Sequence, residues 1–297
     1  MAEPIDVIFD TDPGKDDAFA LFLALAAADR LNVMALTTAA GNLGLETTTA
    51  AARRIVEAAG RPEIPVYSGC PAPLLSAHEP LPHLHGHDGL GGSGLPEMAR
   101  GPEPDHAVAK LIELIDRASA PVTVAAIAPL TNLAVAFTMR PDLAAKLARL
   151  VIMGGARSAG NITDHAEFNI HVDPHAAQIV LTAGAPTVLV PLDITRPTLP
   201  EPDWFDGLAG FGTLGRAIAG MWRERSMPLH DVIVTAYLLW PDLFALERCR
   251  VDVDVDNQET RGRTRIEATS DGSIDVVADI DRDRLYESIE STLRSYK

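Results

Sequence analysis

The sequence predicts an α/β fold: a single domain over residues 1–297 with a mostly parallel, Rossmann-like central sheet flanked by helices. Short apolar segments rich in β-branched residues alternate with segments of helical pattern through much of the chain. Such alternation favours right-handed β-α-β crossovers, which build parallel sheets. No repeat, low-complexity tract or linker divides the 297 residues, and 47% hydrophobic residues suffice for one large core.

The expected strands and helices follow one another in order. Strands are expected where apolar runs are bounded by turn residues, at residues 6–9, 31–38, 65–67, 122–127, 150–153 and 187–190. Helices are expected where apolar residues recur at helical spacing, at residues 16–28, 45–59, 106–118, 130–138 and 174–183. Because ligands of such sheets bind outside the carboxyl ends of the strands, we expect the active site at that edge.

The rest of the chain follows other patterns. Residues 68–105 are dense in Pro, Gly and His and too long for an ordinary connection, which is typical of functional or disordered loops. Residues 201–237 have a helical pattern, and residues 248–280 indicate strands with turns at Asp256-Asn257 and Asp271-Gly272. Residues 281–296 are expected to form a capped helix that ends the chain.

Composition restricts the partners and the compartment. A formal charge of −16 and the lack of any basic run argue against nucleic acid or an anionic membrane as partner. Cys70 and Cys249 form neither a CxxC motif nor a disulfide framework. The N-terminus lacks a signal-peptide pattern, and the longest apolar run, residues 18–28, is too short to span a bilayer. We therefore expect a soluble cytoplasmic protein.

Four carboxylates, those of Asp10, Asp12, Asp16 and Asp17, lie close together just after the first expected strand. Pro13-Gly14 turns the chain between them, so that several oxygens can converge on one point. Clustered carboxylates repel one another unless a cation or protons offset their charge. Oxygen ligands without Cys or a His cluster suit Ca²⁺ or Mg²⁺ rather than Zn²⁺. The simpler interpretation, that Asp16 and Asp17 only cap the next helix, leaves Asp10 and Asp12 unexplained.

Three other groups of polar residues attract attention. Asn161, Glu167 and Asn169 combine amides with a carboxylate on one loop, which suits recognition of hydroxyl groups. His230-Asp231 precedes an apolar helical run, where the aspartate is either an N-cap or a distant metal ligand. The histidines at residues 83–87 could bind a transition metal, although loop histidines are more often solvated.

The acidic cluster is part of a longer motif. Residues 10–18, Asp10-Thr11-Asp12-Pro13-Gly14-Lys15-Asp16-Asp17-Ala18, resemble the DTDPGxDDA signature of the inosine-uridine-preferring type of nucleoside hydrolases. Further matches follow in order at Thr37-Thr38-Ala39-Ala40-Gly41-Asn42, His85-Gly86-His87-Asp88-Gly89-Leu90, Pro129-Leu130-Thr131-Asn132, Met153-Gly154-Gly155, Ala166-Glu167-Phe168-Asn169 and His230-Asp231. The resemblance implies hydrolysis of ribonucleosides to ribose and free base by a homo-oligomer, a dimer or tetramer.

The resemblance also assigns roles at the sugar. It implies that one Ca²⁺, which also binds the ribose hydroxyls and the attacking water, is held by Asp12, Asp17, Asp231 and the backbone carbonyl of Ile127. Asp12 is the expected general base. The implied substrate contacts are Asp16 at the 2′-hydroxyl, Asn169 and Asp231 at the 2′/3′ edge, Asn161 and Glu167 at the 5′-hydroxyl, and Asn42, Met153 and Phe168 elsewhere in the site. A carboxylate-lined pocket suits this reaction because the sugar becomes oxocarbenium-like as the bond breaks.

The resemblance specifies the leaving-group side less fully. His230 matches a residue that protonates the departing base or lies beside it, and His85 lies on a loop that closes over the base. An imidazole that titrates near neutrality suits the acid role. Residues 214–218 lack the tyrosines that relatives often supply here, and Trp222 is expected to stack on the base instead. The sequence therefore leaves open whether purines or pyrimidines are preferred.

Two alternatives remain open. The start of the motif is also similar to aspartate-nucleophile phosphatases, in which Asp10 would be the nucleophile, Asp12 the acid/base and Mg²⁺ the cofactor. Pro13-Gly14 fits that family poorly, and Asp16-Asp17 has no role in it. The other alternative is a non-catalytic Ca²⁺-dependent nucleoside-binding protein, against which the presence of both Asp12 and His230 argues.

Overall fold

The computed structural model describes residues 3–96, 98–222 and 227–296. Within them, one sheet runs in the order β3-β2-β1-β4-β5-β6-β9-β7-β8. The strands are β1 (Ile5–Thr11), β2 (Leu31–Thr38), β3 (Val66–Ser68), β4 (Thr123–Ala126), β5 (Arg149–Met153), β6 (Thr187–Val190), β7 (Phe244–Val253), β8 (Thr264–Ala268) and β9 (Ile274–Ile280). Strands β1 to β6 pair parallel with one another and β9 pairs parallel with β6, whereas β7 pairs antiparallel with both β8 and β9. The predicted mostly parallel α/β sheet is confirmed.

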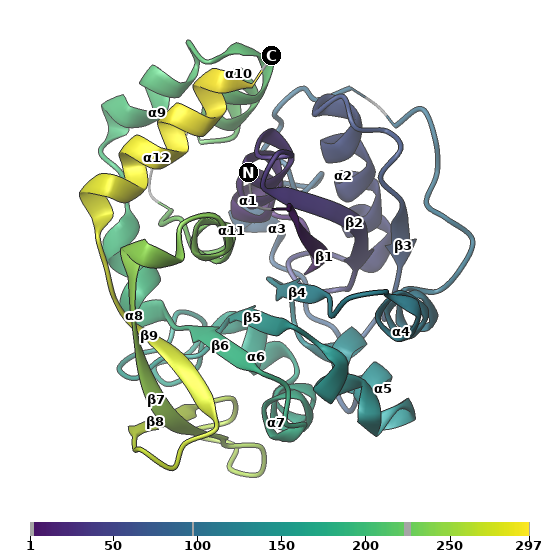
Figure 1. Cartoon of the computed structure of the whole chain (residues 1–297), viewed down its shortest axis with the longest axis vertical. Coiled ribbons are helices and arrows are strands. Elements are labelled where there is room, and N and C mark those ends of the chain that lie inside the picture. The colour runs from purple at the N-terminus through teal and green to yellow at the C-terminus, as the bar shows by residue number, and fades with distance from the viewer. Residues whose placement is uncertain (1–2, 97, 223–226, 297) are drawn as a thin grey trace.

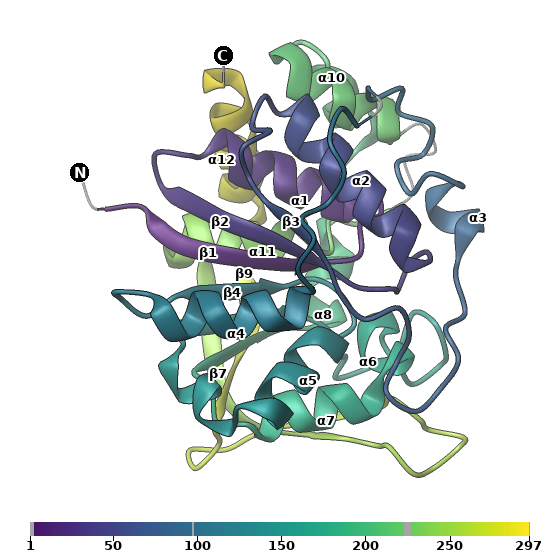
Figure 2. The same ribbon diagram turned by 90° about the vertical axis from the view of Figure 1, so that its right-hand side faces the viewer.

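Helices cover both faces of the sheet (Figures 1 and 2). On one face lie α1 (Lys15–Ala26), α2 (Leu45–Ala58), α9 (Pro202–Leu208), α10 (Gly212–Met221), α11 (Val232–Leu239) and α12 (Arg282–Ser295). On the other lie α4 (Ala107–Arg117), α5 (Thr131–Met139) and α7 (Pro174–Thr182). Short elements complete the chain: α3 (Pro82–His85), α6 (Phe168–Val172), α8 (Leu192–Thr195) and the 3₁₀ turns η1 (Pro141–Lys146), η2 (Arg196–Thr198) and η3 (Pro241–Leu243).

Strand β1 shows why the sequence folds in this way. Its side chains alternate between the two helix layers, with Val7 and Phe9 in the core under α1 and Ile8 in the core under α4 and α5. All three side chains are fully buried. A central parallel strand is covered on both faces, so its sequence is continuously apolar rather than alternating. The polar residues of β1 are confined to its two ends, and those at its carboxyl end, with the turn that follows, carry the acidic motif.

The structure extends the sequence prediction in the C-terminal third. Strand β7 begins at Phe244, before the predicted start at residue 248, because β7 continues along β9 from Phe244 to Cys249. The terminal helix is capped as predicted, since the carboxylate of Asp281 accepts a hydrogen bond from the Arg284 amide. The helical stretch predicted at 201–237 forms α9, α10 and α11, and its residues 223–226 lie outside the described part of the chain.

Two expectations from composition can be compared with the structure. Cys70 and Cys249 are both free thiols. In the described ranges, no helix is both long enough and apolar enough to cross a membrane.

Candidate active site

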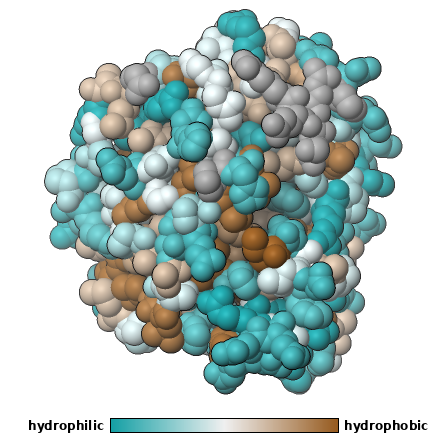
Figure 3. Space-filling model, turned by 180° about the vertical axis from the view of Figure 1, so that it is seen from behind, coloured by the Kyte–Doolittle hydropathy of each residue, from teal (hydrophilic) through white to brown (hydrophobic). Residues whose placement is uncertain are grey.

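A cavity of about 240 Å³ lies at the carboxyl-end edge of the sheet, close to the lower end of small-molecule sites. Viewed from the side opposite to Figure 1, hydrophobic residues gather around a hollow near the middle of an otherwise largely hydrophilic surface (Figure 3). The lining residues include most of those predicted from the sequence: Asp16, Asn42, His85, Ile127, Met153, Asn161, Glu167, Phe168, Asn169, Trp222, His230 and Asp231. Two predicted residues, Asp12 and Asp17, do not line the cavity and are fully buried.

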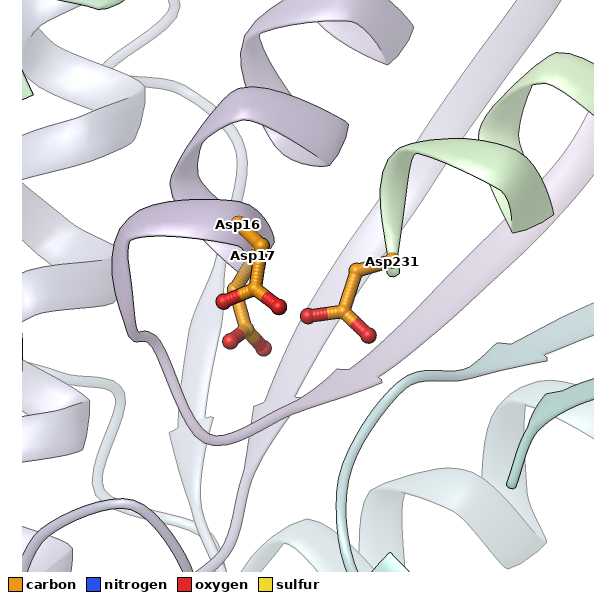
Figure 4. Close-up of side chains that lie close together, drawn as sticks. All are labelled: Asp16, Asp17 and Asp231. Carbon is orange, nitrogen blue, oxygen red and sulfur yellow. The ribbon is translucent and has the colours of Figure 1, made fainter. Parts of the chain in front are cut away.

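Three carboxylates converge beside the cavity, and Figure 4 shows that of Asp231 directed toward those of Asp16 and Asp17. Asp16 and Asp17 come from the first turn of α1, and Asp231 directly precedes α11. One oxygen of each lies within 4.8 Å of one oxygen of each of the others. The side chain of Asp231 makes no capping hydrogen bond to α11, so the N-cap interpretation does not account for it. Residues more than 200 positions apart in the sequence thus form one acidic site.

Asp17 and Asp12 are fixed by hydrogen bonds to the surrounding loops. The Asp17 carboxylate accepts bonds from the Thr11 hydroxyl at 2.6 Å and the Gly14 amide at 2.9 Å, the second of which caps α1. The Asp12 carboxylate accepts one bond through Oδ2, at 2.6 Å from the amide of Asn42. Its Oδ1 is buried and has no partner among the described groups. The three mutually close carboxylates do not include Asp12. They do include Asp16, which the sequence analysis expected only as a sugar contact.

Burial raises the pKa of every carboxyl group in this cluster. The pKa values of Asp16 and Asp17 rise to about 6, because the charged form loses its hydration on burial. Burial raises the pKa values of Asp12 and Asp231 well above the usual aspartate range, and repulsion from the neighbouring carboxylates adds to the effect. A buried set of mutually repelling carboxylates is unfavourable unless protons or a cation offset the charge.

The residues present fit a hard divalent cation. All the converging donors are oxygens, and Asp16 Oδ1 is buried without a partner among the described groups, as is Asp12 Oδ1. Oxygen-only donor sets favour Ca²⁺ or Mg²⁺ over Zn²⁺. The acidic cluster can therefore hold a metal ion. Within the described ranges, no group of histidines or cysteines offers a comparable site, including the histidine run at residues 83–87.

Asp10 has a supporting position beneath this cluster. Its Oδ1 accepts hydrogen bonds from the Thr37 hydroxyl at 2.6 Å and the Asn132 amide at 2.8 Å. Asn132 in turn donates to the carbonyl of Thr38 and accepts from the amide of Cys70. Asp10 thus joins the ends of β1 and β2 to α5 and to the loop that follows β3.

The loop between β5 and α6 supplies the opposite wall. Glu167 caps α6 and accepts three backbone hydrogen bonds, from Gly155, Asn169 and Ile170, at 2.9 to 3.1 Å. Its burial raises its pKa to about 7. The Asn169 amide donates to the Met153 carbonyl at the end of β5. Two of the predicted hydroxyl-recognising groups are therefore fixed by the backbone around them before a ligand binds.

Two histidines face the cavity from different elements. His85 ends α3, and its Nδ1 accepts a hydrogen bond from the amide of Lys15 at 3.1 Å. His230 Nδ1 lies 2.7 Å from the hydroxyl of Thr195 at the end of α8. Burial lowers the pKa of each imidazole to about 4, so both rings are neutral at pH 7. An acid role for His230 would therefore require its pKa to be raised when the substrate binds.

Trp222 lines the cavity, but most of its ring belongs to an aromatic cluster. It stacks on Phe205 at a centroid distance of 5.2 Å and meets Phe19 edge-on at 5.7 Å. Its Nε1 donates to the carbonyl of Met227, and only 2% of the residue is exposed. One face of the indole is therefore already occupied by protein.

Sequence reasoning missed two polar residues of the site. Lys15 lines the cavity, although the sequence analysis treated it only as the variable position of the acidic motif. Thr195, the partner of His230, lies just after the carboxyl end of β6. The strand-end rule that indicated the other loops could have found Thr195.

The fold and the cavity define an α/β protein with a pocket of small-molecule size and, beside it at the strand ends, an acidic cluster that can hold a cation. The chain belongs to the inosine-uridine preferring nucleoside hydrolase family, whose model matches residues 7–287. Members of this family are metal-dependent enzymes that cleave N-glycosidic bonds, which excludes the phosphatase interpretation.

Individual relatives cover nearly the whole chain. A pyrimidine-specific ribonucleoside hydrolase, RihA, of Salmonella agona is 36% identical over 100% of both chains. A plant nucleoside hydrolase structure superposes with a TM-score of 0.91 at 31% identity, covering 98% of this chain and 99% of its own. A purine-preferring ribonucleoside hydrolase from Gardnerella vaginalis has the same TM-score at 26% identity and covers 98% of both chains.

Proposed function

We propose that the protein hydrolyses ribonucleosides to ribose and free nucleobase with calcium as its metal. The observation that supports this most directly is the convergence of Asp16, Asp17 and Asp231 beside a cavity of small-molecule size. Asp12 and the Ile127 carbonyl complete the proposed ligand set. Bound calcium would supply positive charge that lowers the pKa of a nearby water and attracts the ribose hydroxyls. Calcium suits a flexible set of carboxylate and carbonyl oxygens better than magnesium does.

Asp12 is the proposed general base. Desolvation makes its carboxylate more basic, and its Oδ1 has no partner in the described part of the chain, so this oxygen is free to accept a proton. It would take one proton from water as the water oxygen bonds to C1′ of the ribose. The bond from C1′ to the base nitrogen breaks, and its electron pair leaves with the base.

The surrounding polar residues would hold the sugar. Asp16 and Asp231 would accept hydrogen bonds from the secondary hydroxyls, with Asn169 beside them, while Asn161 and Glu167 would bind the 5′-hydroxyl. Asn42 would hold Asp12 and Asp17 in place, because its backbone amide donates to Asp12 and its side-chain amide donates to Asp17. A set of carboxylates around the ring stabilises the positive charge that develops on the sugar.

His230 is proposed to lie beside the leaving base. If its Nδ1 accepts a hydrogen bond from the Thr195 hydroxyl, its Nε2 carries the ring proton and can donate a hydrogen bond to a nitrogen or oxygen of the base. Full protonation of the base by His230 requires the substrate to raise its pKa from about 4. His85, on the neighbouring wall, is the second group expected to approach the base.

The activity is tested by incubating the protein with uridine, cytidine and inosine and measuring free ribose. We expect ribose release that is lost on removal of bound calcium and restored by adding it back. Asp12→Asn should lower kcat about 10²–10⁴-fold, the usual contribution of a general base. A folded Asp12→Asn protein with near-normal kcat would remove Asp12 from this role, and full activity in calcium-free protein would contradict the proposed metal.

A further inference from the structure

Lys15 is the one Lys or Arg among the described residues that line the cavity. It begins α1 and directly precedes the aspartates of the acidic cluster. A cation is electrostatically unfavourable at the amino end of a helix, where the helix dipole is positive. Stabilisation of α1 therefore does not explain why a lysine occupies this position.

The surroundings of Lys15 hold its stem but give its ammonium no close ion pair, although its charge acts at longer range on Asp16, where it partly offsets the rise in pKa caused by burial. The side chain is mostly buried, with the residue only 8% exposed. A Cβ placed on Gly91 would lie 3.0 Å from Lys15 Cδ, so the aliphatic stem packs closely against that glycine. Within the described ranges, no carboxylate oxygen lies within 4.0 Å of Nζ and no hydrogen bond from Nζ is formed. A purely structural lysine at this depth would be expected to form an ion pair.

The neighbours of Lys15 place it away from the sugar-binding loop. The backbone amide of Lys15 donates to His85. Its aliphatic stem contacts Gly91, which also lies close to the Met221 carbonyl at the end of α10. Trp222 follows directly and lines the cavity. Asn161 and Glu167, the proposed 5′-hydroxyl contacts, come from the separate loop between β5 and α6. Lys15 thus belongs to the wall where the nucleobase would lie.

We propose that the Lys15 ammonium is a catalytic group that stabilises the negative charge on the departing nucleobase and favours bases with ring carbonyl oxygens. The inference rests on the proposed nucleoside hydrolysis. As the C1′–N bond breaks, its electron pair moves onto the base and spreads to those oxygens, which lie against Nζ. No proton leaves Lys15. The base anion afterwards takes a proton from solvent, and Asp12 releases to solvent the proton that it took from water. A fixed ammonium in a low-dielectric pocket stabilises such charge strongly.

The test compares leaving groups in wild-type protein, Lys15→Met and Lys15→Arg. Methionine keeps the length and packing of the stem without the charge. We expect Lys15→Met to lower kcat for uridine about 100-fold. For 4-nitrophenyl riboside, kcat should fall less than about threefold, because the departing nitrophenolate needs little stabilisation. Lys15→Arg should recover much of the uridine activity. The ratio of inosine to adenosine turnover should fall in Lys15→Met, because adenine lacks a ring carbonyl.

The matched control is Lys110→Met on α4, whose ammonium pairs with Asp105 and Glu113 far from the cavity. Binding of barbiturate, a pyrimidine-like anion, gives a second measurement that needs no turnover. Inhibition by barbiturate should be weaker in Lys15→Met than in the wild-type protein, whereas inhibition by neutral uracil should change less. Equal losses on uridine and nitrophenyl riboside, or unchanged uridine turnover, would overturn the role of Lys15 alone. Wild-type protein that releases ribose from no nucleoside would overturn the proposed function and this inference together.

Discussion

Gly41 determines how closely the loop after β2 approaches Asp12. A Cβ at this position would collide with the Asp12 carboxylate and also with Pro129. Because the Asn42 amide must reach Asp12 Oδ2, the preceding residue has no room for a side chain. The glycine is therefore required by close approach, not by an unusual backbone conformation.

We expect Gly41→Ala to displace Asp12 and to reduce both ribose release and bound calcium. Overpacking of this kind costs about 1–3 kcal/mol of folding free energy. The matched control is Gly44→Ala in the same loop, where an added Cβ meets no atom within 4 Å. Thermal melting, metal analysis and the ribose assay would be run on both variants. Unchanged calcium content and turnover in Gly41→Ala would contradict the tight fit inferred here.

The sequence indicated some of the candidate site residues and not others, for physical reasons. Asp10, Asp12, Asp16 and Asp17 were predicted from their spacing to form one cation-binding cluster, because a dense local charge is visible in one stretch of chain, and their separate roles came from the family resemblance. Asp231 as an isolated residue looked like an ordinary cap, and only the family resemblance linked it to the cluster. Lys15 could not be assigned, since its missing ion-pair partner is a property of the folded environment.

Among the elements, α2 holds the long segment that carries His85. Arg54 donates from its guanidinium to the carbonyls of Leu95 and Pro96 and to Asp88 Oδ2. The other oxygen of Asp88 accepts the amides of Leu90 and Gly92. This network fixes the turn that follows His85, which the sequence indicated only as a long loop without periodicity. Such a loop is ordered by side-chain contacts rather than by repeating backbone bonds, so periodicity could not reveal its structure.

We expect Arg54→Met to loosen this segment and raise KM for nucleosides, with a smaller effect on kcat. Each lost hydrogen bond to a charged group contributes about 1.5–3 kcal/mol, and limited proteolysis within residues 86–96 should become faster. Arg61→Met is the control, because the Arg61 side chain pairs, among the residues that the structure describes, with the exposed Glu63 just beyond the same helix. An unchanged cleavage pattern together with unchanged KM would show that α2 does not order the segment.

For the whole molecule, the sheet brings distant residues to one edge. Parallel pairing of β1 with β2 and β4 places the ends of these strands side by side, so that Thr11, Thr38 and Ala126 lie in neighbouring positions. The presence and the mostly parallel pairing of the central strands followed from alternating patterns, which are local, whereas their order in the sheet did not. The antiparallel extension by β7 and β8 and the approach of α11 to α1 depend on packing of distant segments, and no local pattern specified them.

We expect the acidic cluster to link the stability of the molecule to pH and to the proposed calcium. Burial raises the pKa values of Asp16 and Asp17 from 3.8 to about 6, so between these values the calcium-free folded state binds more protons than the unfolded state. Its stability should therefore fall as pH rises through this window, with the full loss present above about pH 6. The proposed calcium would bind the ionised carboxylates, so its stabilisation should be small near pH 5 and large at pH 7.5, about 2.7 kcal/mol at 100 times Kd. Thermal melting at both pH values, with calcium and with chelator, measures this difference, and an equal calcium-dependent rise in Tm at the two pH values would contradict the linkage.

Asp16→Asn should reduce the pH dependence of the stability of the chelated protein. Asp142→Asn, which removes an exposed surface carboxylate, is the control and should leave the calcium-dependent rise in Tm unchanged.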